Sequence, residues 1–286
     1  MNRGTRRRSS RRAALTLAAA GTVLAGASPH AGPAAELGQA PGGLSVTFLA
    51  NEGVLLSSGG TQVLIDALFV KYGDGYAVPA DSTQAALERA RPPFDSVDLV
   101  LVTHRHGDHF HPAPAAAHLA ANRGATLLTS QQVIDSMRHV AGIARLAPRM
   151  VARTMAPGTR RRVIVNGLPV ELLGLPHGGW RQRRVEHLGY VVELGGRRLL
   201  HVGDAELSEA TLAPLGLDTS RIDVALLPAW AVTDRGSRQA IERWIRPRQV
   251  VAFHLSDGAS GREVREVQDA WRGADVFVRS LEVRSW

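Results

Sequence analysis

The chain contains no cysteine among its 286 residues. Disulfide bonds, thiolate metal ligands and thiol nucleophiles are therefore excluded as sources of stability or chemistry. Aromatic residues are also few, at 5%, although 44% of the residues are hydrophobic. A chain of this length and apolar content can build one large core, or two small ones, without covalent cross-links.

Lysine is almost absent, because one lysine stands against 33 arginines. The formal net charge of +8 is concentrated at the start of the chain, where residues 1–35 contain six arginines and no acidic residue. Without these six charges the rest of the chain has a net charge of about +2, which is close to balance. We therefore expect no nucleic-acid-binding surface.

Residues 1–35 have the layout of an export signal peptide followed by a linker. An arginine-rich start precedes a fifteen-residue apolar stretch over 13–27, and small residues follow it. That stretch is shorter than the roughly 20 residues of a membrane span. Arg11 and Arg12 in "SRRAALT" resemble a twin-arginine signal, and an arginine-rich general secretory signal is the alternative. We expect an exported protein, periplasmic or secreted, with no stable membrane span in the mature chain.

Strand and helix patterns fill residues 43–286, which we expect to form one domain. Turn pairs at Gly59-Gly60, Asn166-Gly167 and Gly195-Gly196 predict three hairpins. Between and after these hairpins, strands alternate with helices. Strands are expected at 45–50, 54–58, 61–68, 96–104, 125–130, 161–165, 168–175, 188–194, 197–204, 224–230, 248–255 and 275–280. Helices are expected at 82–90, 112–123, 131–140, 238–245 and 262–271. This order predicts an α+β fold in which two mixed sheets pack face to face with helices outside.

The segment "VTHRHGDHFH" at 102–111 has metal-binding chemistry. Its histidines and aspartate follow the spacing H-x-H-x-D-H, at His104, His106, Asp108 and His109. Side chains alternate along a strand, so His104 and His106 can point the same way, and Gly107 permits a sharp turn. We expect Asp108 and His109 to start the next helix and face the same space. Zinc-like ions take nitrogen and oxygen ligands of this kind.

Three further candidates each follow a strand. His177 lies in "LLGLPHGG", Asp204 in "LLHVGDAEL" and His254 in "VVAFHLSDG". Considered singly, each has an ordinary structural interpretation, as a loop histidine, a turn aspartate and a core histidine. Together they supply the additional ligands and the bridging group that a two-metal site needs.

The order of these motifs resembles the metallo-β-lactamase superfamily of hydrolases over residues 45–286. The resemblance implies a four-layer αββα sandwich of two mixed β-sheets flanked by helices. It implies two divalent metal ions, with zinc as the first choice and manganese or iron as alternatives. The ligand set that it implies is His104, His106 and His177 for one ion, Asp108, His109 and His254 for the other, and Asp204 as the bridge.

The chain departs from the true β-lactamases of this superfamily, which lack the bridging aspartate and in several cases use a cysteine ligand. The pattern is closer to branches that cleave phosphodiesters, thioesters, esters or lactones, and it is broadly similar to ascorbate-phosphate lactonases. The resemblance implies that a metal-bridging hydroxide attacks a carbonyl or phosphoryl centre. Asp108 is the expected catalytic residue, orienting the nucleophile and moving its proton. Asp66 is expected to orient a metal-bound imidazole.

Two other functions stay open at this point: an iron-dependent, oxygen-using member of the same fold, and a non-catalytic metal-binding module. We expect a small-molecule substrate. An anionic one would suit "WRQRR" at 180–184, although a solvated loop is the simpler interpretation. Trp230 either lines the site or caps the core. The remaining histidines are expected in structural or surface roles (His111, His118, His139), near the site entrance (His187) and in the sheet packing (His201).

Overall fold

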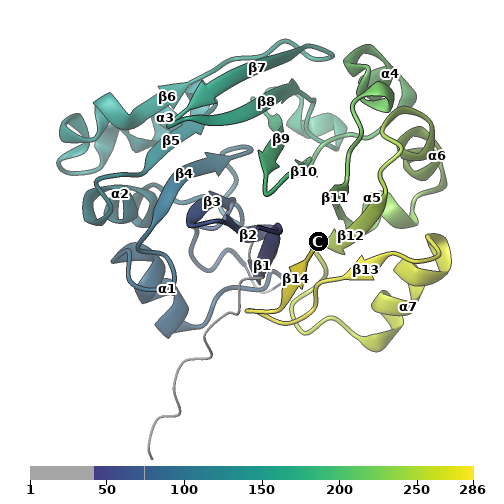
Figure 1. Ribbon diagram of the computed structural model, residues 1–286, viewed down its shortest axis with the longest axis horizontal. Helices are drawn as coiled ribbons and strands as arrows, with labels where there is room; N and C mark the ends of the chain where they lie inside the picture. The colour runs from purple at the N-terminus through teal and green to yellow at the C-terminus, as the bar shows by residue number, and fades with distance from the viewer. Residues whose placement is uncertain (1–41, 74) are drawn as a thin grey trace, which may run out of the picture. The chain divides into compact units, whose positions relative to one another are not determined.

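A computed structural model describes residues 42–73 and 75–286, so the predicted leader at 1–35 lies outside the described residues. Two seven-stranded mixed sheets run through the described part (Figure 1). The first sheet has the order β14-β1-β2-β3-β4-β5-β6, and the second has the order β13-β12-β11-β10-β9-β8-β7. Each sheet is antiparallel where hairpins connect its strands and parallel where helices make the connections, because parallel neighbours need a long crossover.

The first sheet contains β1 Ser45–Ala50, β2 Gly53–Ser58, β3 Thr61–Ile65, β4 Val97–Val102, β5 Thr126–Thr129, β6 Met150–Ala152 and β14 Val283–Ser285. The second contains β7 Arg160–Val165, β8 Leu168–Gly174, β9 Leu188–Leu194, β10 Arg197–His201, β11 Val224–Pro228, β12 Gln249–Phe253 and β13 Asp275–Val276. The α-helices are α1 Asp81–Glu88, α2 Pro112–Ala121, α3 Gln131–Ser136, α4 Glu209–Leu212, α5 Ala229–Thr233, α6 Arg235–Trp244 and α7 Gly261–Ala270.

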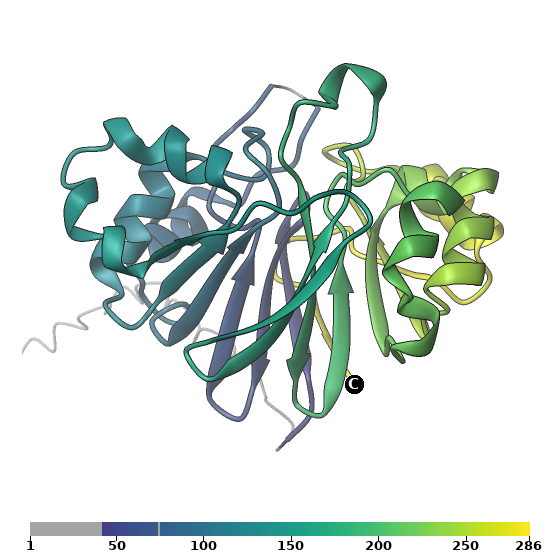
Figure 2. The ribbon, with the colours of Figure 1, turned by 90° about the horizontal axis from the view of Figure 1, so that it is seen from above.

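Three apolar clusters define four layers. The central cluster joins the facing sides of the two sheets, for example Leu56 and Leu101 with Leu172. A second cluster lies between the first sheet and α1, α2 and α3, and a third lies between the other sheet and the helices that follow β10. Figure 2 shows the sheets face to face with helices on both outer sides. The predicted αββα sandwich of the α+β class is therefore confirmed.

Several element boundaries differ from the predictions. The expected helix at 131–140 ends at Ser136 and continues as a 3-10 turn, and the expected strand at 224–230 ends at Pro228, where α5 begins. The expected strand at 275–280 contains only two paired residues, and the chain then crosses to the first sheet to form β14. Strand β6 and helix α4 were not expected, because three or four residues carry too little periodicity to be recognised.

The carboxyl ends of strands from both sheets meet at one edge of the molecule. Strands β3 and β4 end there in the first sheet, and β8, β10 and β12 end there in the second. The predicted site residues follow these strand ends directly, which is why residues distant in sequence converge. None of the helices in the described ranges has the length and apolar character that crossing a bilayer requires.

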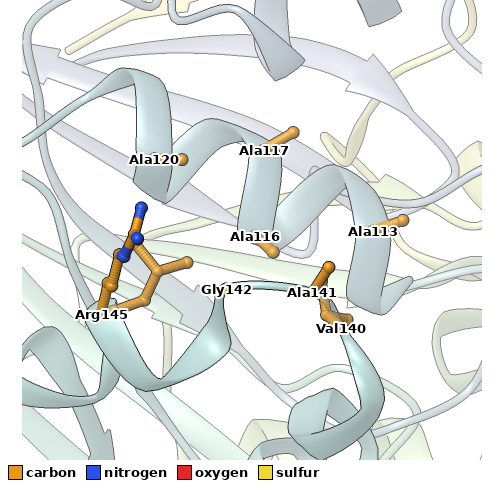
Figure 3. Close-up of a pocket in the computed structure, with 9 residues that line it drawn as sticks. Ala113, Ala116, Ala117, Ala120, Val140, Ala141, Gly142 and Arg145 are labelled. Atoms are coloured by element: carbon orange, nitrogen blue, oxygen red, sulfur yellow. The ribbon is translucent and has the colours of Figure 1, made fainter.

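An apolar groove of about 420 Å³ lies between α2 and the segment 140–146 (Figure 3). Its lining is mostly alanine, with Arg145 as the one charged residue. The lining contains no histidine, carboxylate or hydroxyl group, so it offers neither a metal ligand nor a nucleophile. The histidines and carboxylates that could hold a metal lie instead at the strand ends.

Arg149 fixes the C-terminal end of α2 to the first sheet. Its guanidinium donates hydrogen bonds to the carbonyl oxygens of Leu119, Asn122 and Ala125, at 2.6–3.0 Å. We expect Arg149→Ala to lower the free energy of unfolding by about 1–3 kcal/mol, because it leaves helix-end carbonyls without donors. Urea unfolding measures the change, with the exposed Arg123→Ala as a matched control. Equal stability of the two variants would contradict this role.

Candidate metal centre

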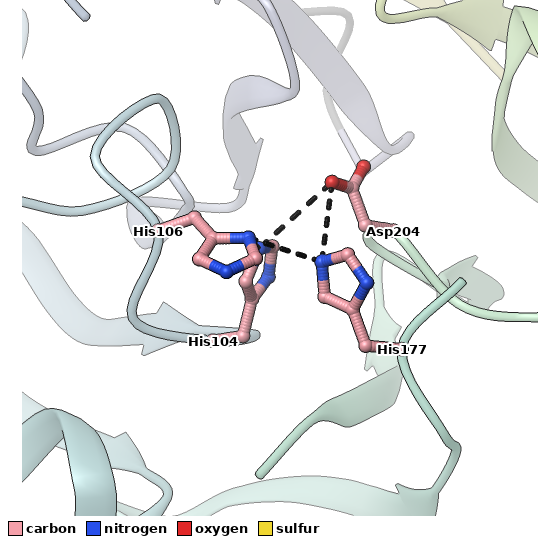
Figure 4. A group of neighbouring side chains, drawn as sticks. All are labelled: His104, His106, His177 and Asp204. Atoms are coloured by element: carbon pink, nitrogen blue, oxygen red, sulfur yellow. Dashed lines mark hydrogen bonds and ion pairs between the residues drawn. The ribbon is translucent and has the colours of Figure 1, made fainter. Parts of the chain in front are cut away.

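The first cluster consists of His104, His106, His177 and Asp204, whose side chains point toward one another (Figure 4). His106 Nδ1 lies 3.0 Å from His104 Nε2 and 3.1 Å from His177 Nε2. Asp204 Oδ2 lies 3.5 Å from His177 Nε2 and 3.9 Å from His104 Nε2. Ligands about 2.0 Å from a tetrahedral ion are about 3.3 Å apart, so these separations suit one cation.

The second cluster consists of Asp108, His109, His254 and again Asp204. Asp108 Oδ2 lies 3.4 Å from His109 Nε2 and 3.6 Å from His254 Nε2. The carboxylate of Asp204 lies 3.5 Å from His109 Nε2 through Oδ2 and 3.3 Å from His254 Nε2 through Oδ1. These separations also suit a single cation, and Asp204 belongs to both clusters.

The turn at 104–110 differs in one respect from the expectation. Asp108 and His109 do not start α2, which begins at Pro112 with His111 as its N-cap. They lie in a tight turn instead, in which the backbone N–H groups of His109 and Phe110 donate to His106 O at 3.1 and 2.9 Å. This turn brings both side chains back to the site, so the predicted convergence holds although the helix starts later.

Fixed tautomers leave lone pairs facing the first cluster. Thr103 Oγ1 donates to Asp66 Oδ2 at 2.6 Å, so it accepts from His104 Nδ1 at 2.9 Å. His177 Nδ1 donates to the carbonyl of Gly178 at 2.6 Å. The Nε2 atoms of both histidines therefore carry lone pairs, and they face the same point. Nitrogen lone pairs that converge on one point can serve as two of the ligands of a cation.

Asp66 fixes the tautomer of His109 in the second cluster, as Thr103 fixes that of His104 in the first. The fully buried carboxylate of Asp66 accepts from His109 Nδ1 at 3.0 Å and from the backbone N–H of Thr103 at 2.7 Å. His109 Nε2 is consequently left for a ligand, and neither it nor His254 Nε2 has a hydrogen-bond partner. The predicted position of Asp66 behind a candidate ligand agrees with this geometry. A carboxylate behind a histidine in this way orients the ring and raises its basicity.

The pKa shifts describe a buried site with excess negative charge. Burial, followed by the charge of His109, lowers the pKa of His104 well below its usual value, so this imidazole is neutral as a ligand must be. Burial alone would lower the pKa of His109 too, but Asp204 and Asp108 raise it well above the usual range. One proton on His109 thus offsets several carboxylates. Divalent cations would offset the same charge, so the donor set fits them.

Sequence reasoning missed residues that support this centre. Thr103 is one, and Asn51 is another, because its amide nitrogen donates to Asp108 O at 3.0 Å and to Asp108 Oδ2 at 3.3 Å. Glu52 is fully buried beside His109, and burial raises the pKa of its carboxyl well above the usual value. Asn51 and Glu52 each contact a residue 57 positions away, and Thr103 contacts Asp66 37 positions away, so no local spacing signals these contacts.

The remaining histidines lie in varied places. His187 was expected near the site entrance, but it is buried, with its ring centroid 5.1 Å from that of His104, and burial lowers its pKa to about 3. His201 is buried against Phe253, and its Nε2 donates to Glu52 O at 3.0 Å. His118 is buried and bonds to Leu87 O at 2.6 Å. His139 lies in a 3-10 turn, away from both clusters.

Replacing Thr103 with valine is expected to weaken metal binding at the first cluster by about 10–100-fold, because the shape is kept while the hydroxyl that orients His104 is lost. Competition with a chromophoric chelator measures the metal affinity. Thr129→Val is the matched control, since that buried hydroxyl donates to the Val102 carbonyl and Thr129 belongs to neither cluster. Wild-type metal affinity in Thr103→Val would show that Thr103 does not act on the metal site.

The family of the chain follows from comparison with known proteins. Residues 61–270 match the model of the beta-lactamase superfamily domain. A UPF0173 metal-dependent hydrolase of Symbiobacterium thermophilum is 29% identical over 252 residues, which cover 84% of this chain and 98% of the relative. The likeness therefore extends over nearly the whole described region and over nearly the whole relative.

Solved structures share the fold at low sequence identity. A possible metal-dependent hydrolase from Veillonella parvula aligns with a TM-score of 0.59 at 14% identity, over 85% of this chain and 99% of that one. CmlA, a diiron β-hydroxylase from Streptomyces venezuelae, aligns with a TM-score of 0.52 at 17% identity, over 87% of this chain and 55% of that one. The chain belongs to the β-lactamase superfamily and is a metal-dependent hydrolase with the metallo-β-lactamase fold.

Proposed function

We propose that the chain is a dinuclear hydrolase that cleaves an ester, lactone, thioester or phosphodiester bond of a small molecule. The observation that carries the proposal is the sharing of Asp204, whose carboxylate lies within 3.9 Å of ligand nitrogens in both clusters. One carboxylate between two donor sets suits two neighbouring cations. Zinc fits the nitrogen and oxygen donors best, and manganese or iron are the alternatives.

In this proposal, His104, His106 and His177 would hold one cation, Asp108, His109 and His254 would hold the other, and Asp204 would serve both. Two cations held in this way would make a shared water nucleophilic near neutral pH and polarise the oxygen of the bond that is cleaved.

Asp108 has a second role as the proton carrier. Burial alone would raise its pKa, but the imidazoles of His109 and His254 outweigh burial and hold the pKa below its usual value. Asp108 is therefore a carboxylate at neutral pH, the protonation state that a proton acceptor requires. The amide of Asn51 bonds to the carboxylate and to the backbone of Asp108, and so fixes its direction.

An iron-dependent, oxygen-using enzyme is the second candidate, because the diiron β-hydroxylase CmlA shares this fold. The two candidates differ in metal and in reaction. A hydrolase needs no oxygen and remains active with zinc, whereas a hydroxylase requires iron, oxygen and a reductant. The hydrolase is favoured because the matched relative is itself called a metal-dependent hydrolase.

The test is anaerobic hydrolysis by the purified, zinc-reconstituted chain. A panel of aryl esters, lactones, thioesters and phosphodiesters is assayed with zinc, manganese or ferrous iron. Turnover of at least one class without oxygen, abolished by a chelator and restored by zinc, is the expected result. Product formation only with iron, oxygen and a reductant would replace the hydrolase with the second candidate.

We also propose that the protein is exported, on the basis of the arginine-rich, apolar composition of residues 1–35. Fractionation of cells that express the full chain tests this. The protein should be found outside the cytoplasm, and replacement of Arg11 and Arg12 by lysine should retain it inside if the twin-arginine route is used. Cytoplasmic location of the unaltered chain would contradict export.

A further inference from the structure

We propose that Tyr72, Tyr76 and Trp230 form aromatic walls around the metal centre and select substrates with a planar apolar group beside the bond that is cleaved. This inference rests on the proposed hydrolase function and names the substrate class that the same site takes. The aromatic side chains that are exposed to solvent lie beside the candidate metal ligands, and binding of metal does not require them.

Exposed aromatic residues are concentrated at the site. The chain has six phenylalanines, five tryptophans and three tyrosines, and most of those in the described part are at least partly buried. In the described ranges, the exposed aromatic side chains are Tyr72, Trp180 and Trp230. Trp180 follows the ligand His177 by three residues, and the other two contact glycines next to candidate ligands. Large exposed apolar rings gathered at one place mark a binding site.

The first wall stands beside the second cluster. Tyr72, which is 49% exposed, packs on Gly107 so closely that a Cβ there would lie 2.4 Å from its ring. The rings of Tyr72 and Tyr76 are 5.8 Å apart, and Tyr76 meets the His254 ring edge to face at 5.7 Å. The wall therefore runs from the turn between His106 and Asp108 to His254.

The second wall stands beside the first cluster. Trp230, which is 40% exposed, lies in the first turn of α5, directly after β11, and its ring lies 3.4 Å from the Cβ position of Gly178. Gly178 follows the ligand His177, and its backbone N–H donates to Asp204 O at 2.6 Å. Trp230 is thus held next to the backbone of two candidate ligands.

Partly exposed aromatic rings favour planar partners. Aromatic pairs gain from stacked and edge-to-face contact in addition to the area that they bury. A substrate with only a small group beside its carbonyl or phosphoryl centre would leave both walls in water. A substrate with an aromatic or other planar unsaturated group would cover them, so the walls act through binding rather than through the chemical step.

The experiment compares product-like carboxylates on the zinc-loaded full chain by titration calorimetry. Acetate, cyclohexylacetate and phenylacetate share a carboxylate and differ in the group that would reach the walls. We expect phenylacetate to bind at least about 10-fold more tightly than acetate, with cyclohexylacetate between them. The intermediate value for cyclohexylacetate separates stacking on planar rings from burial of apolar area alone.

Truncation variants assign the effect to the walls. Tyr72→Ala and Trp230→Ala should each lower the affinity for phenylacetate by about threefold or more and leave that for acetate unchanged. Tyr72→Phe should retain the wild-type preference. Ile164→Ala, which removes a 73% exposed side chain at the opposite end of the second sheet, is the control and should have no effect. Metal content is measured for every variant and should stay at the wild-type value.

The outcomes separate this inference from the function on which it rests. If a chain that takes up metal and hydrolyses substrates of the panel binds phenylacetate and acetate equally, the proposed role of the aromatic walls is wrong. The proposed hydrolase function would then still hold. An unchanged preference in both alanine variants would do the same. Failure to take up metal, or to hydrolyse any substrate in the panel, would overturn the hydrolase and this inference together.

Discussion

Asp108→Asn is expected to lower kcat by about 10²–10⁴-fold, because the amide keeps the shape of the side chain but cannot accept a proton. The change also removes a charged donor from the second cluster, where Asp108 Oδ2 faces His109 and His254 at 3.4 and 3.6 Å. The first cluster shares no atom with Asp108 and should keep its metal. Steady-state kinetics with the best substrate of the panel, together with metal analysis, measures both effects.

Asp257→Asn is the control for charge, because this exposed aspartate follows His254 by three residues and belongs to neither cluster. Its kcat should stay within about twofold of wild type, as expected for an exposed substitution. If Asp108→Asn retained more than a tenth of the wild-type kcat with full metal content, Asp108 would be a ligand at most and not the proton carrier.

Gly203→Ala is expected to disable the centre through the backbone. Gly203 precedes Asp204 and has φ +57, a left-handed conformation that costs about 1–2 kcal/mol for a residue with a side chain. A Cβ there would lie 2.7 Å from Thr103 Oγ1 and 2.8 Å from His187 Nε2. Overpacking of this kind adds about 1–3 kcal/mol, so we expect a total loss of about 2–5 kcal/mol in stability and loss of bound metal.

Gly196→Ala isolates the backbone part of that effect. Gly196 has φ +69 but no heavy atom within 4 Å of its Cβ position, so only the conformational cost applies. We expect Gly196→Ala to lose about 1–2 kcal/mol and to keep its metal. Urea unfolding and metal analysis of both variants make the comparison. If the two variants had equal stability and equal metal content, the contacts of a Cβ at position 203 with Thr103 and His187 would contribute to neither effect.

The residues of the two clusters could be predicted to converge because they follow strands, and strand ends gather at one edge of a sheet. Strand alternation predicted that His104 and His106 lie together; both follow the last residue of β4, and their nitrogens lie 3.0 Å apart. The Asn166-Gly167 hairpin was equally readable, since both residues adopt positive φ as a tight hairpin turn requires.

Supporting residues and short elements could not be predicted in the same way. Thr103 acts by joining Asp66 to His104 across two strands, and Asn51 acts on a residue 57 positions away. His187 carries no feature in the sequence that distinguishes a buried ring from one at the entrance. Strand β14 pairs with β1 although about 230 residues separate them, and its three residues have no recognisable period.

The most direct test of the shared two-metal centre is the metal content of the purified chain beside its Asp204→Ala variant. Plasma emission after reconstitution should give about two equivalents of zinc, manganese or iron in the wild type and fewer in the variant, because the variant removes a donor from both clusters. Glu206→Ala, an exposed carboxylate two residues further along, should keep both equivalents. Absence of bound metal in the wild type, or full metal content in Asp204→Ala, would contradict the account.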